Sequence, residues 1–308
     1  MVVLVGPTAG GKTRLGVEAA HLLRSEIVSA DSRQVYRGLD IGSGKDLHEY
    51  ARVRPAIPYH LIDVADPRDV YSVLHYQQDC YRLLEGKQRE TSYRSGRPLV
   101  MVGGSGLYVE AVLQGYRIPT VPPDEPHRAE LMLADPDELV AELRRRDPGL
   151  AARTDCSSKK RVVRALEIVR HANGETVERS RPAPVRVEHA VFALDISAGE
   201  LARRIDARLE HRLDAGMIAE VEGLLATGVP RARMDQLGLE YREVSAYLDG
   251  AQSREAMVEA LRLGIRRLAK RQRTWFRGLQ RRGTGVRWVE PAAAVEAMVS
   301  CFAEAGGA

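Results

Sequence analysis

The stretch Gly6-Pro7-Thr8-Ala9-Gly10-Gly11-Lys12-Thr13 follows the apolar run Val2–Val5 and has the spacing G-x-x-x-x-G-K-[ST]. Between a strand and a helix, such small residues let successive backbone N–H groups surround a phosphate at the positive end of the helix. We expect Lys12 to reach a terminal phosphate and the Thr13 hydroxyl to hold Mg²⁺. A glycine turn that only caps a helix would explain neither side chain. The stretch therefore predicts a phosphate-binding loop, but it does not say whose phosphate is bound.

Apolar runs and helical patterns alternate along the chain. Strands are expected at Val2–Val5, Glu26–Ser29, Leu99–Val102 and Ala190–Leu194, and helices at Lys12–Arg24, Val73–Arg89, Glu200–Leu213, Ile218–Ala226 and Arg254–Leu279. This alternation predicts an α/β fold with a parallel sheet core of the P-loop NTPase type. Ligands of such sheets bind beyond the carboxyl ends of the strands. Asp31 and Gly103-Gly104-Ser105, which follow two of these strands, are therefore expected beside the phosphate loop.

The amino-acid composition of the sequence changes near Ile118. A proline-rich entry (Pro119, Pro122, Pro123, Pro126) is followed by charged helical patterns at Pro136–Arg146 and Lys159–His171 and by a proline-rich exit at Arg181–Pro184. We therefore predict a helical insertion domain over residues 118–189. The P-loop catalytic core, with its C-terminal helices, is expected to consist of residues 1–117 and 190–308.

Composition excludes several classes of protein. The chain has 308 residues, of which 44% are hydrophobic and 29% charged, as in an ordinary globular protein. No apolar run approaches the ~20 residues of a membrane helix, and we expect no signal peptide. Three distant cysteines and eight scattered histidines exclude a disulfide framework and a zinc ribbon. We expect a cytoplasmic protein without membrane contact.

Basic residues are concentrated near the C-terminal end. Residues 262–287 contain nine arginines, one lysine and no acidic residue, and Arg262, Arg266, Lys270, Arg273 and Arg277 recur at helical spacing. A solvated cationic helix would usually interleave glutamates for pairing one turn apart. The segment therefore predicts contact with a polyanion such as a nucleic acid.

Two further segments indicate the chemistry at the loop. Asp31 at a strand end is placed to act as a general base, although an aspartate followed by serine can also cap a helix. In most P-loop ATPases the strand at Leu99–Val102 would end in an acid that helps to hold Mg²⁺, whereas here it ends in Gly103. This argues against ordinary ATP hydrolysis. Gly38–Lys45 forms a second glycine-rich loop with a cation.

Taken together, these residues resemble the tRNA dimethylallyltransferase (tRNA isopentenyltransferase) family. The matching segments, in the family's order, are GPTAGGKT, DSRQVYRGLDIGSGK, PYHLIDVADP, VGGSGLYVEAVLQG, KRVVRALEI, RRIDARLEHRLDAGMIAEVEGLL and AKRQRTWFRG. They span nearly the whole chain. The resemblance implies transfer of a dimethylallyl group from dimethylallyl diphosphate to N6 of the adenosine 3′ of the anticodon, in tRNAs that read codons beginning with U. It implies Mg²⁺ as cofactor and no obligate protein partner, and we expect a monomer.

The resemblance also implies roles for individual residues. The diphosphate would be bound by Gly6, Pro7, Thr8, Ala9, Gly10, Gly11, Lys12 and Thr13, with the metal on Thr13. Asp31 would be the base, Ser105 would supply a hydroxyl where the family usually has threonine, and Arg204 would help to neutralise the diphosphate. The tRNA would be contacted by Asp31, Ser32, Arg33, Gln34, Ser105, Arg128, Lys160, Arg161, Val162, Val163, Arg164, Tyr241, Arg242, Lys270, Arg271, Gln272, Arg273, Thr274, Trp275, Phe276 and Arg277.

The chain departs from the family pattern at Glu240, where glycine is common, at Ile265, where threonine is often found, and at Cys156–Lys159. No Cys/His zinc finger follows the core. Three alternatives remain: a prenyltransferase acting on free adenine nucleotides, a P-loop small-molecule kinase, and a non-catalytic RNA-binding protein. The insertion and the basic helix favour tRNA over a free nucleotide. Gly103 argues against the kinase, and an intact Lys12, Thr13 and Asp31 argue against a non-catalytic protein.

Overall fold

The computed structural model describes residues 1–89, 97–122, 124–171 and 187–306. Contacts divide the chain into two compact units, one made of Met1–Gly115 with Val185–Ala308 and the other of Tyr116–Pro184. The expected domain bounds, 118 and 189, fall a few residues from these divisions. Pro123 and the proline-rich exit at residues 181–184 lie outside the described residues.

The larger unit is built on a six-stranded parallel sheet in the order β3-β2-β4-β1-β5-β6. The strands are β1 (Val2–Val5), β2 (Ile27–Ser29), β3 (Tyr59–His60), β4 (Val100–Gly103), β5 (Ala190–Leu194) and β6 (Val286–Val289). Every residue of β1, β2 and β4 is buried, because helices cover both faces of a parallel sheet, and apart from Ser29 these strands are therefore apolar. The predicted α/β fold with a P-loop-type parallel sheet is confirmed.

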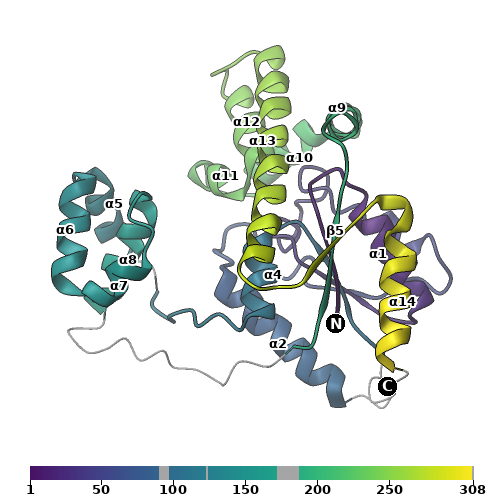
Figure 1. Cartoon of the computed structure of the whole chain (residues 1–308). Coiled ribbons are helices and arrows are strands. Elements are labelled where there is room, and N and C mark those ends of the chain that lie inside the picture. Colours follow the sequence, from purple (N-terminus) through teal and green to yellow (C-terminus); the bar gives the residue numbers. More distant parts are fainter. Residues whose placement is uncertain (90–96, 123, 172–186, 307–308) are drawn as a thin grey trace. The chain divides into compact units, whose positions relative to one another are not determined.

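Helices lie on both faces of the sheet (Figure 1). The helices α1 (Lys12–Leu22) and α14 (Ala294–Gly306) pack together, as do α2 (Val73–Arg89) and α4 (Gly106–Leu113) on the other side. Short 3₁₀ turns, η1 (Leu47–Ala51) and η2 (Pro291–Ala293), complete the connections. Gly16 lets α1 lie close to the sheet, because a Cβ atom there would overlap Val102 of β4.

Five helices connect β5 to β6: α9 (Ala198–Asp214), α10 (Met217–Ala226), α11 (Arg231–Leu237), α12 (Leu239–Leu248) and α13 (Arg254–Arg281). The 28-residue α13 begins where the Ser253 hydroxyl accepts a hydrogen bond from the Ala256 N–H at 3.2 Å. Its buried stripe includes Leu261, Ile265 and Phe276, whereas its arginines lie on the remaining surface. The helix therefore joins the core while presenting cations to solvent.

The smaller unit consists of α5 (Glu125–Leu133), α6 (Pro136–Arg146), α7 (Pro148–Arg153) and α8 (Lys159–His171). It has a hydrophobic cluster of its own, with Leu139 and Leu143 of α6 packed against Val162 and Leu166 of α8. Asp135 caps α6 by accepting hydrogen bonds from the Asp137 and Glu138 N–H groups. Over the described part of the chain, no helix has the length and apolar character needed to cross a bilayer.

Candidate active site

The phosphate loop connects β1 to α1 in the way that anion binding requires. Ala9 and Gly11 have positive φ angles of 59° and 80°, and the Gly10 N–H donates to the Pro7 carbonyl at 3.2 Å. No side chain caps the N-terminus of α1 at Gly11. The first N–H groups of α1 thus remain available, and the helix dipole adds partial positive charge at the same place. A diphosphate is the kind of group that this arrangement binds.

Lys12 lies inside this loop, where its Nζ donates to the Pro7 carbonyl at 2.7 Å. Burial lowers the pKa of Lys12 to about 8, and the nearby carboxylate of Asp31 opposes that shift. An anion entering the site would stabilise the charged ammonium. Lys12 is therefore a cation that is destabilised until a phosphate binds.

Asp31 follows β2 and lies on the same pocket as the loop. Its Oδ1 accepts a hydrogen bond from the Arg33 N–H at 2.9 Å, so the residue opens a turn; no helix begins there. Oδ2 has no hydrogen-bond partner among the residues described. The helix-capping interpretation is therefore wrong, and one carboxylate oxygen is left for a ligand.

The glycines after β4 allow close approach of neighbouring segments. A Cβ atom on Gly103 would overlap the Ala30 carbonyl, and one on Gly104 would overlap the amide of Gln272. Gly103 lines the pocket with Asp31, as the sequence predicts. The Ser105 hydroxyl instead accepts from the Ser32 N–H at 2.9 Å. Ser105 thus fixes the turn after Asp31, and it is not among the residues that line the pocket.

Gln272 links the basic helix α13 to the phosphate loop. Its Oε1 accepts from the Thr8 N–H at 2.7 Å, and its Nε2 donates to the Gly104 carbonyl at 3.0 Å. One of the loop donors predicted for the diphosphate is therefore already used by a side chain. Gln272 was expected to contact tRNA, and the structure places it against the loop.

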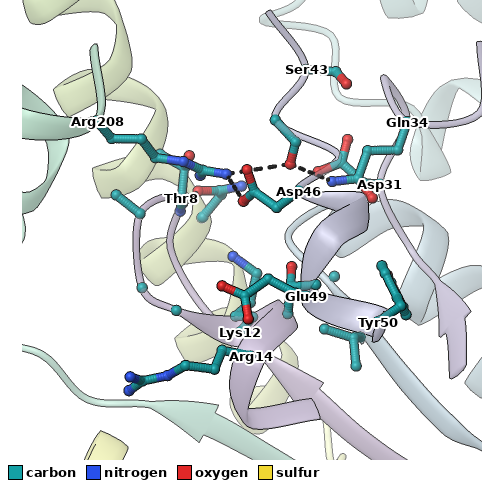
Figure 2. Close-up of a pocket in the computed structure, with 18 residues that line it drawn as sticks. Thr8, Lys12, Arg14, Asp31, Gln34, Ser43, Asp46, Glu49, Tyr50 and Arg208 are labelled. Carbon is teal, nitrogen blue, oxygen red and sulfur yellow. Dashed lines mark hydrogen bonds and ion pairs between the residues drawn. The ribbon is translucent and has the colours of Figure 1, made fainter. Parts of the chain in front are cut away.

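A second loop, residues 38–46, closes the other side of the pocket (Figure 2). The Gln34 amide donates to the Gly44 carbonyl at 3.1 Å, and Arg208 of α9 donates to the same carbonyl and pairs with Asp46. Burial and the neighbouring Arg212 lower the pKa of Arg208, which Asp46 partly offsets. The pocket has a volume of about 190 Å³. It is lined by residues 8–14, Asp31, Gln34, Ser43, Gly44, Asp46, Glu49, Tyr50, Val102, Gly103, Arg208 and Gln272.

Two cations noted in the sequence, Arg204 and Lys45, do not line this pocket. Arg204 pairs with Glu200 on its own helix at 2.7 Å, one turn before Arg208. Lys45 is buried, with its Nζ 2.8 Å from the Tyr36 carbonyl and 2.5 Å from Asp40. Lys45 therefore stabilises the second loop from within. The resemblance assigned the charge-neutralising role to Arg204, whereas the structure brings Arg208, one turn later, to the pocket.

The pocket offers hard oxygen ligands, which suit Mg²⁺. The Thr13 hydroxyl lines the pocket together with Asp31, Asp46 and Glu49. Within the residues that the structure describes, no group of three or more His, Cys, Asp or Glu side chains forms a metal cluster of its own. The donor set thus fits a metal that is held partly by phosphate oxygens, and Thr13 is one of the residues that could hold it.

Several predicted tRNA-binding side chains are unavailable for contact. Tyr241 is buried and its hydroxyl donates to Glu220 at 2.9 Å, while Phe276, Val162 and Val163 belong to hydrophobic cores. The prediction that these four side chains contact tRNA is therefore wrong, because each side chain packs inside its own unit. Trp275 is half-buried beside Gly106.

Other predicted contacts do lie on the surface. In the smaller unit, Lys160 and Arg161 are exposed, whereas Arg128 and Arg164 are partly exposed and share Glu167. Arg242 is exposed and pairs with Glu243. On α13, Lys270, Arg271, Thr274 and Arg277 are exposed, and Arg273 pairs with Asp195 at 3.3 Å. In the larger unit, Ser32 and Arg33 lie at the turn after Asp31 and are partly exposed.

Comparisons with known proteins agree with this geometry. A model of the IPP transferase family matches residues 34–279. The chain is 41% identical over 290 residues to tRNA dimethylallyltransferase 2 of Porphyromonas gingivalis, covering 94% of this chain and 93% of that protein. It is 44% identical over 295 residues to tRNA dimethylallyltransferase 2 of Syntrophotalea carbinolica, with 95% and 94% covered.

Solved structures resemble it as well. The full-length tRNA isopentenylpyrophosphate transferase of Bacillus halodurans superposes with a TM-score of 0.66 at 30% identity, with 100% of this chain and 99% of that chain covered. A eukaryotic dimethylallyltransferase acting on tRNA has a TM-score of 0.70 at 20% identity, with 94% of this chain and 73% of that chain covered. At this identity the likeness supports a shared fold and nothing further. The resemblance predicted from the motifs is confirmed.

Proposed function

The chain belongs to the IPP transferase family. From this premise we propose that it transfers a dimethylallyl group from dimethylallyl diphosphate to N6 of the adenosine 3′ of the anticodon. The substrates would be tRNAs that read codons beginning with U. The observation that carries the proposal is one pocket containing the phosphate loop, the carboxylate of Asp31 and a glycine at the end of β4. In this proposal Asp31 is the base and the loop holds the diphosphate, and the strand β4 ends in glycine and not in the acid typical of ATP hydrolysis.

In the proposed reaction, the adenine N6 attacks the allylic C1 of the donor. The N6–C1 bond forms as the C1–O bond to diphosphate breaks, and the N6 proton passes to Asp31. A positioned carboxylate of this kind contributes about 10²–10⁴-fold. The departing diphosphate gains charge, which Lys12, Arg208 and the N–H groups of the loop would stabilise. Mg²⁺, when bound at Thr13, would neutralise further phosphate charge.

The target adenine must leave its stack to reach this pocket, as in other enzymes that modify a base. We assign tRNA affinity to the exposed cations of α13 and, in the smaller unit, to Lys160 and Arg161 of α8. These side chains supply phosphate contacts that fix register without reading sequence. Arg204 keeps its proposed charge-neutralising role only at longer range, because its guanidinium is paired with Glu200. We further propose that the protein acts as a monomer in the cytoplasm, where its tRNA substrates are.

The test is mass analysis of an anticodon stem-loop whose anticodon ends in A and is followed by adenosine, incubated with dimethylallyl diphosphate and Mg²⁺. We expect one dimethylallyl group to replace one hydrogen, with no product when that adenosine is replaced by guanosine. Parallel reactions with AMP and with ATP test the adenylate prenyltransferase and kinase alternatives. Transfer to AMP but not to the stem-loop, or phosphorylation of a small acceptor by ATP, would overturn the proposal.

A further inference from the structure

A recess on the outer side of α13 contains the tryptophan that the predicted tRNA-binding set leaves out. Trp288 lies on the edge strand β6, half-buried, with its indole Nε1 donating to the Gln280 Oε1 at 3.2 Å. The Arg277 guanidinium lies over the ring, 5.8 Å from its centroid. The recess is lined by Asp195, Thr274, Arg277, Gln280, Arg281 and Trp288. The hydrogen bond fixes the ring plane, so an aromatic surface is held in place beside two cations.

The charge of this recess is not neutralised from within. Arg277 and Arg281 are exposed and have no carboxylate partner in the described part of the chain. The carboxylate that lines the recess, Asp195, is paired with Arg273. Elsewhere on α13, Arg262 and Arg266 are neutralised by Asp206. Two arginines that lack a carboxylate partner among the described residues therefore lie beside the tryptophan.

The recess continues the surface already predicted for tRNA. A neighbouring groove between α9 and α13 shares Thr274 and Arg277 with it. That groove has an apolar floor that includes Leu201 and Ile205, and Lys270 stands on its rim. A strand of nucleic acid whose phosphates follow the cations of α13 would thus reach Trp288 at the end of the helix.

We infer that Trp288, with Arg277 and Gln280, forms a binding site for one unpaired nucleotide of the tRNA. This inference rests on the proposed function for the identity of the RNA. The base would stack on the indole or on the guanidinium above it, the phosphate would lie against Arg277 and Arg281, and the Gln280 amide would be free to reach a base edge. A free phosphate or an acidic peptide would use the arginines but would gain nothing from the ring. The combination of a fixed indole and unpaired cations favours a nucleotide.

The competing explanation is that Trp288 only packs against the core, since part of its surface does so. The two explanations differ in how substitutions act. Loss of a stacked base lowers affinity without removing a phosphate contact, so the salt dependence of binding stays the same. Loss of packing lowers the stability of the protein and leaves the affinity of the folded fraction unchanged.

The experiment uses Trp288→Leu, which keeps apolar volume but removes the aromatic face, and Arg277→Ala as its electrostatic counterpart. We expect Trp288→Leu to weaken binding of an anticodon stem-loop about 5- to 150-fold, with an unchanged slope of log affinity against log salt. The KM for the stem-loop should rise while kcat at saturation is unchanged, because Trp288 does not line the catalytic pocket and the two pockets share no lining residue. Arg277→Ala should lower the salt slope by about one unit.

Fluorescence provides a readout that core packing would not produce. The chain has two tryptophans, so Trp275→Phe leaves Trp288 as the reporter and Trp288→Phe leaves Trp275. We expect the stem-loop to quench emission strongly in the first variant and weakly in the second. Wild-type affinity in a folded Trp288→Leu protein, or absence of quenching in Trp275→Phe, would overturn the inference. Failure of the wild-type protein to bind or prenylate the stem-loop would instead count against the proposed function.

Discussion

The Thr8 N–H donates to the Oε1 of Gln272 at 2.7 Å, across 264 residues of sequence. The same amide donates from Nε2 to the Gly104 carbonyl at 3.0 Å. A helix that carries the exposed cations is thereby fixed to two of the segments that form the diphosphate pocket. Gly104 is required for this contact, because a Cβ atom there would overlap the Gln272 amide.

Gln272→Ala should impair donor binding, because the Thr8 N–H and the Gly104 carbonyl both lose their partner. An unpaired, partly buried polar group costs about 1–3 kcal/mol, so we expect roughly a tenfold or greater increase in the KM for dimethylallyl diphosphate. Steady-state kinetics at saturating stem-loop measure this value. Arg267→Ala is the matched control, since Arg267 is exposed on the same helix and has no ion pair in the described ranges. An equal effect in both variants would assign the loss to a general perturbation of α13 and not to the amide contacts of Gln272.

Gln272→Glu tests the donor half of the same contact. It keeps an acceptor for the Thr8 N–H but loses the donor to Gly104 and places a negative charge beside the diphosphate site. We therefore expect a larger increase in the donor KM than for Gln272→Ala. A donor KM below that of Gln272→Ala would show that the acceptor alone maintains the loop.

Asp31→Asn should separate chemistry from binding. The amide keeps an oxygen that can accept from the Arg33 N–H, so the turn is preserved, but it cannot take a proton. We expect kcat to fall about 10²–10⁴-fold while stem-loop affinity changes by less than about threefold. Single-turnover transfer and filter binding measure the two quantities. Turnover near the wild-type value would remove Asp31 from the base role, and a parallel loss of affinity would assign it to substrate positioning.

The parts of the structure that depend on local sequence could be predicted. The phosphate loop and the central strands β1, β2 and β4 follow from patterns of a few residues, because a strand buried on both faces of a parallel sheet is mostly apolar. Edge strands carry a weaker signal. Tyr59–His60 is two residues long, and Val286–Val289 alternates with exposed Arg287 inside a basic segment, so neither was predicted.

The pocket was predictable only in part, for a related reason. Which residues follow a strand can be read from sequence, and this placed Asp31 and Gly103 at the loop. Which turn of a helix faces that loop depends on how the helix packs. Arg204 and Arg208 are both arginines and lie one turn apart on α9. Only the path of this helix decides that Arg208, and not Arg204, contacts Gly44 and Asp46. Tyr241 was expected to contact tRNA, but its side chain is buried and its hydroxyl donates to Glu220.

Diphosphate affinity should depend on pH through Lys12. Burial lowers the pKa of the free-site lysine to about 8, whereas a bound diphosphate raises it, so binding above pH 8 requires uptake of one proton. Affinity should be constant below about pH 8 and fall up to tenfold per pH unit above it. Calorimetry in two buffers of different ionisation enthalpy measures the proton uptake directly. Lys12→Met should bind weakly and lose this pH dependence; a wild-type curve that is flat to pH 10 would contradict the assignment.

Glu240 should stabilise the protein through Arg212. The carboxylate lies 3.3 Å from the Arg212 guanidinium, which also donates to the Gly42 carbonyl at 3.2 Å, and both charged side chains are largely buried. Because removing one member leaves a buried charge unpaired, Glu240→Ala should lower the free energy of unfolding by about 1–3 kcal/mol. Glycine, the residue common at this position in the family, should cost about 1 kcal/mol more, since it lies in α12.

Urea denaturation measures these differences, with Glu222→Ala as the control because Glu222 is exposed on α10. The control should change stability by less than about 0.5 kcal/mol. Arg212→Met with Glu240→Leu removes both charges while keeping apolar volume, and it should recover most of the loss if the penalty is an unpaired charge. A double variant as unstable as Glu240→Ala would show instead that an unpaired charge is not the cause of the loss.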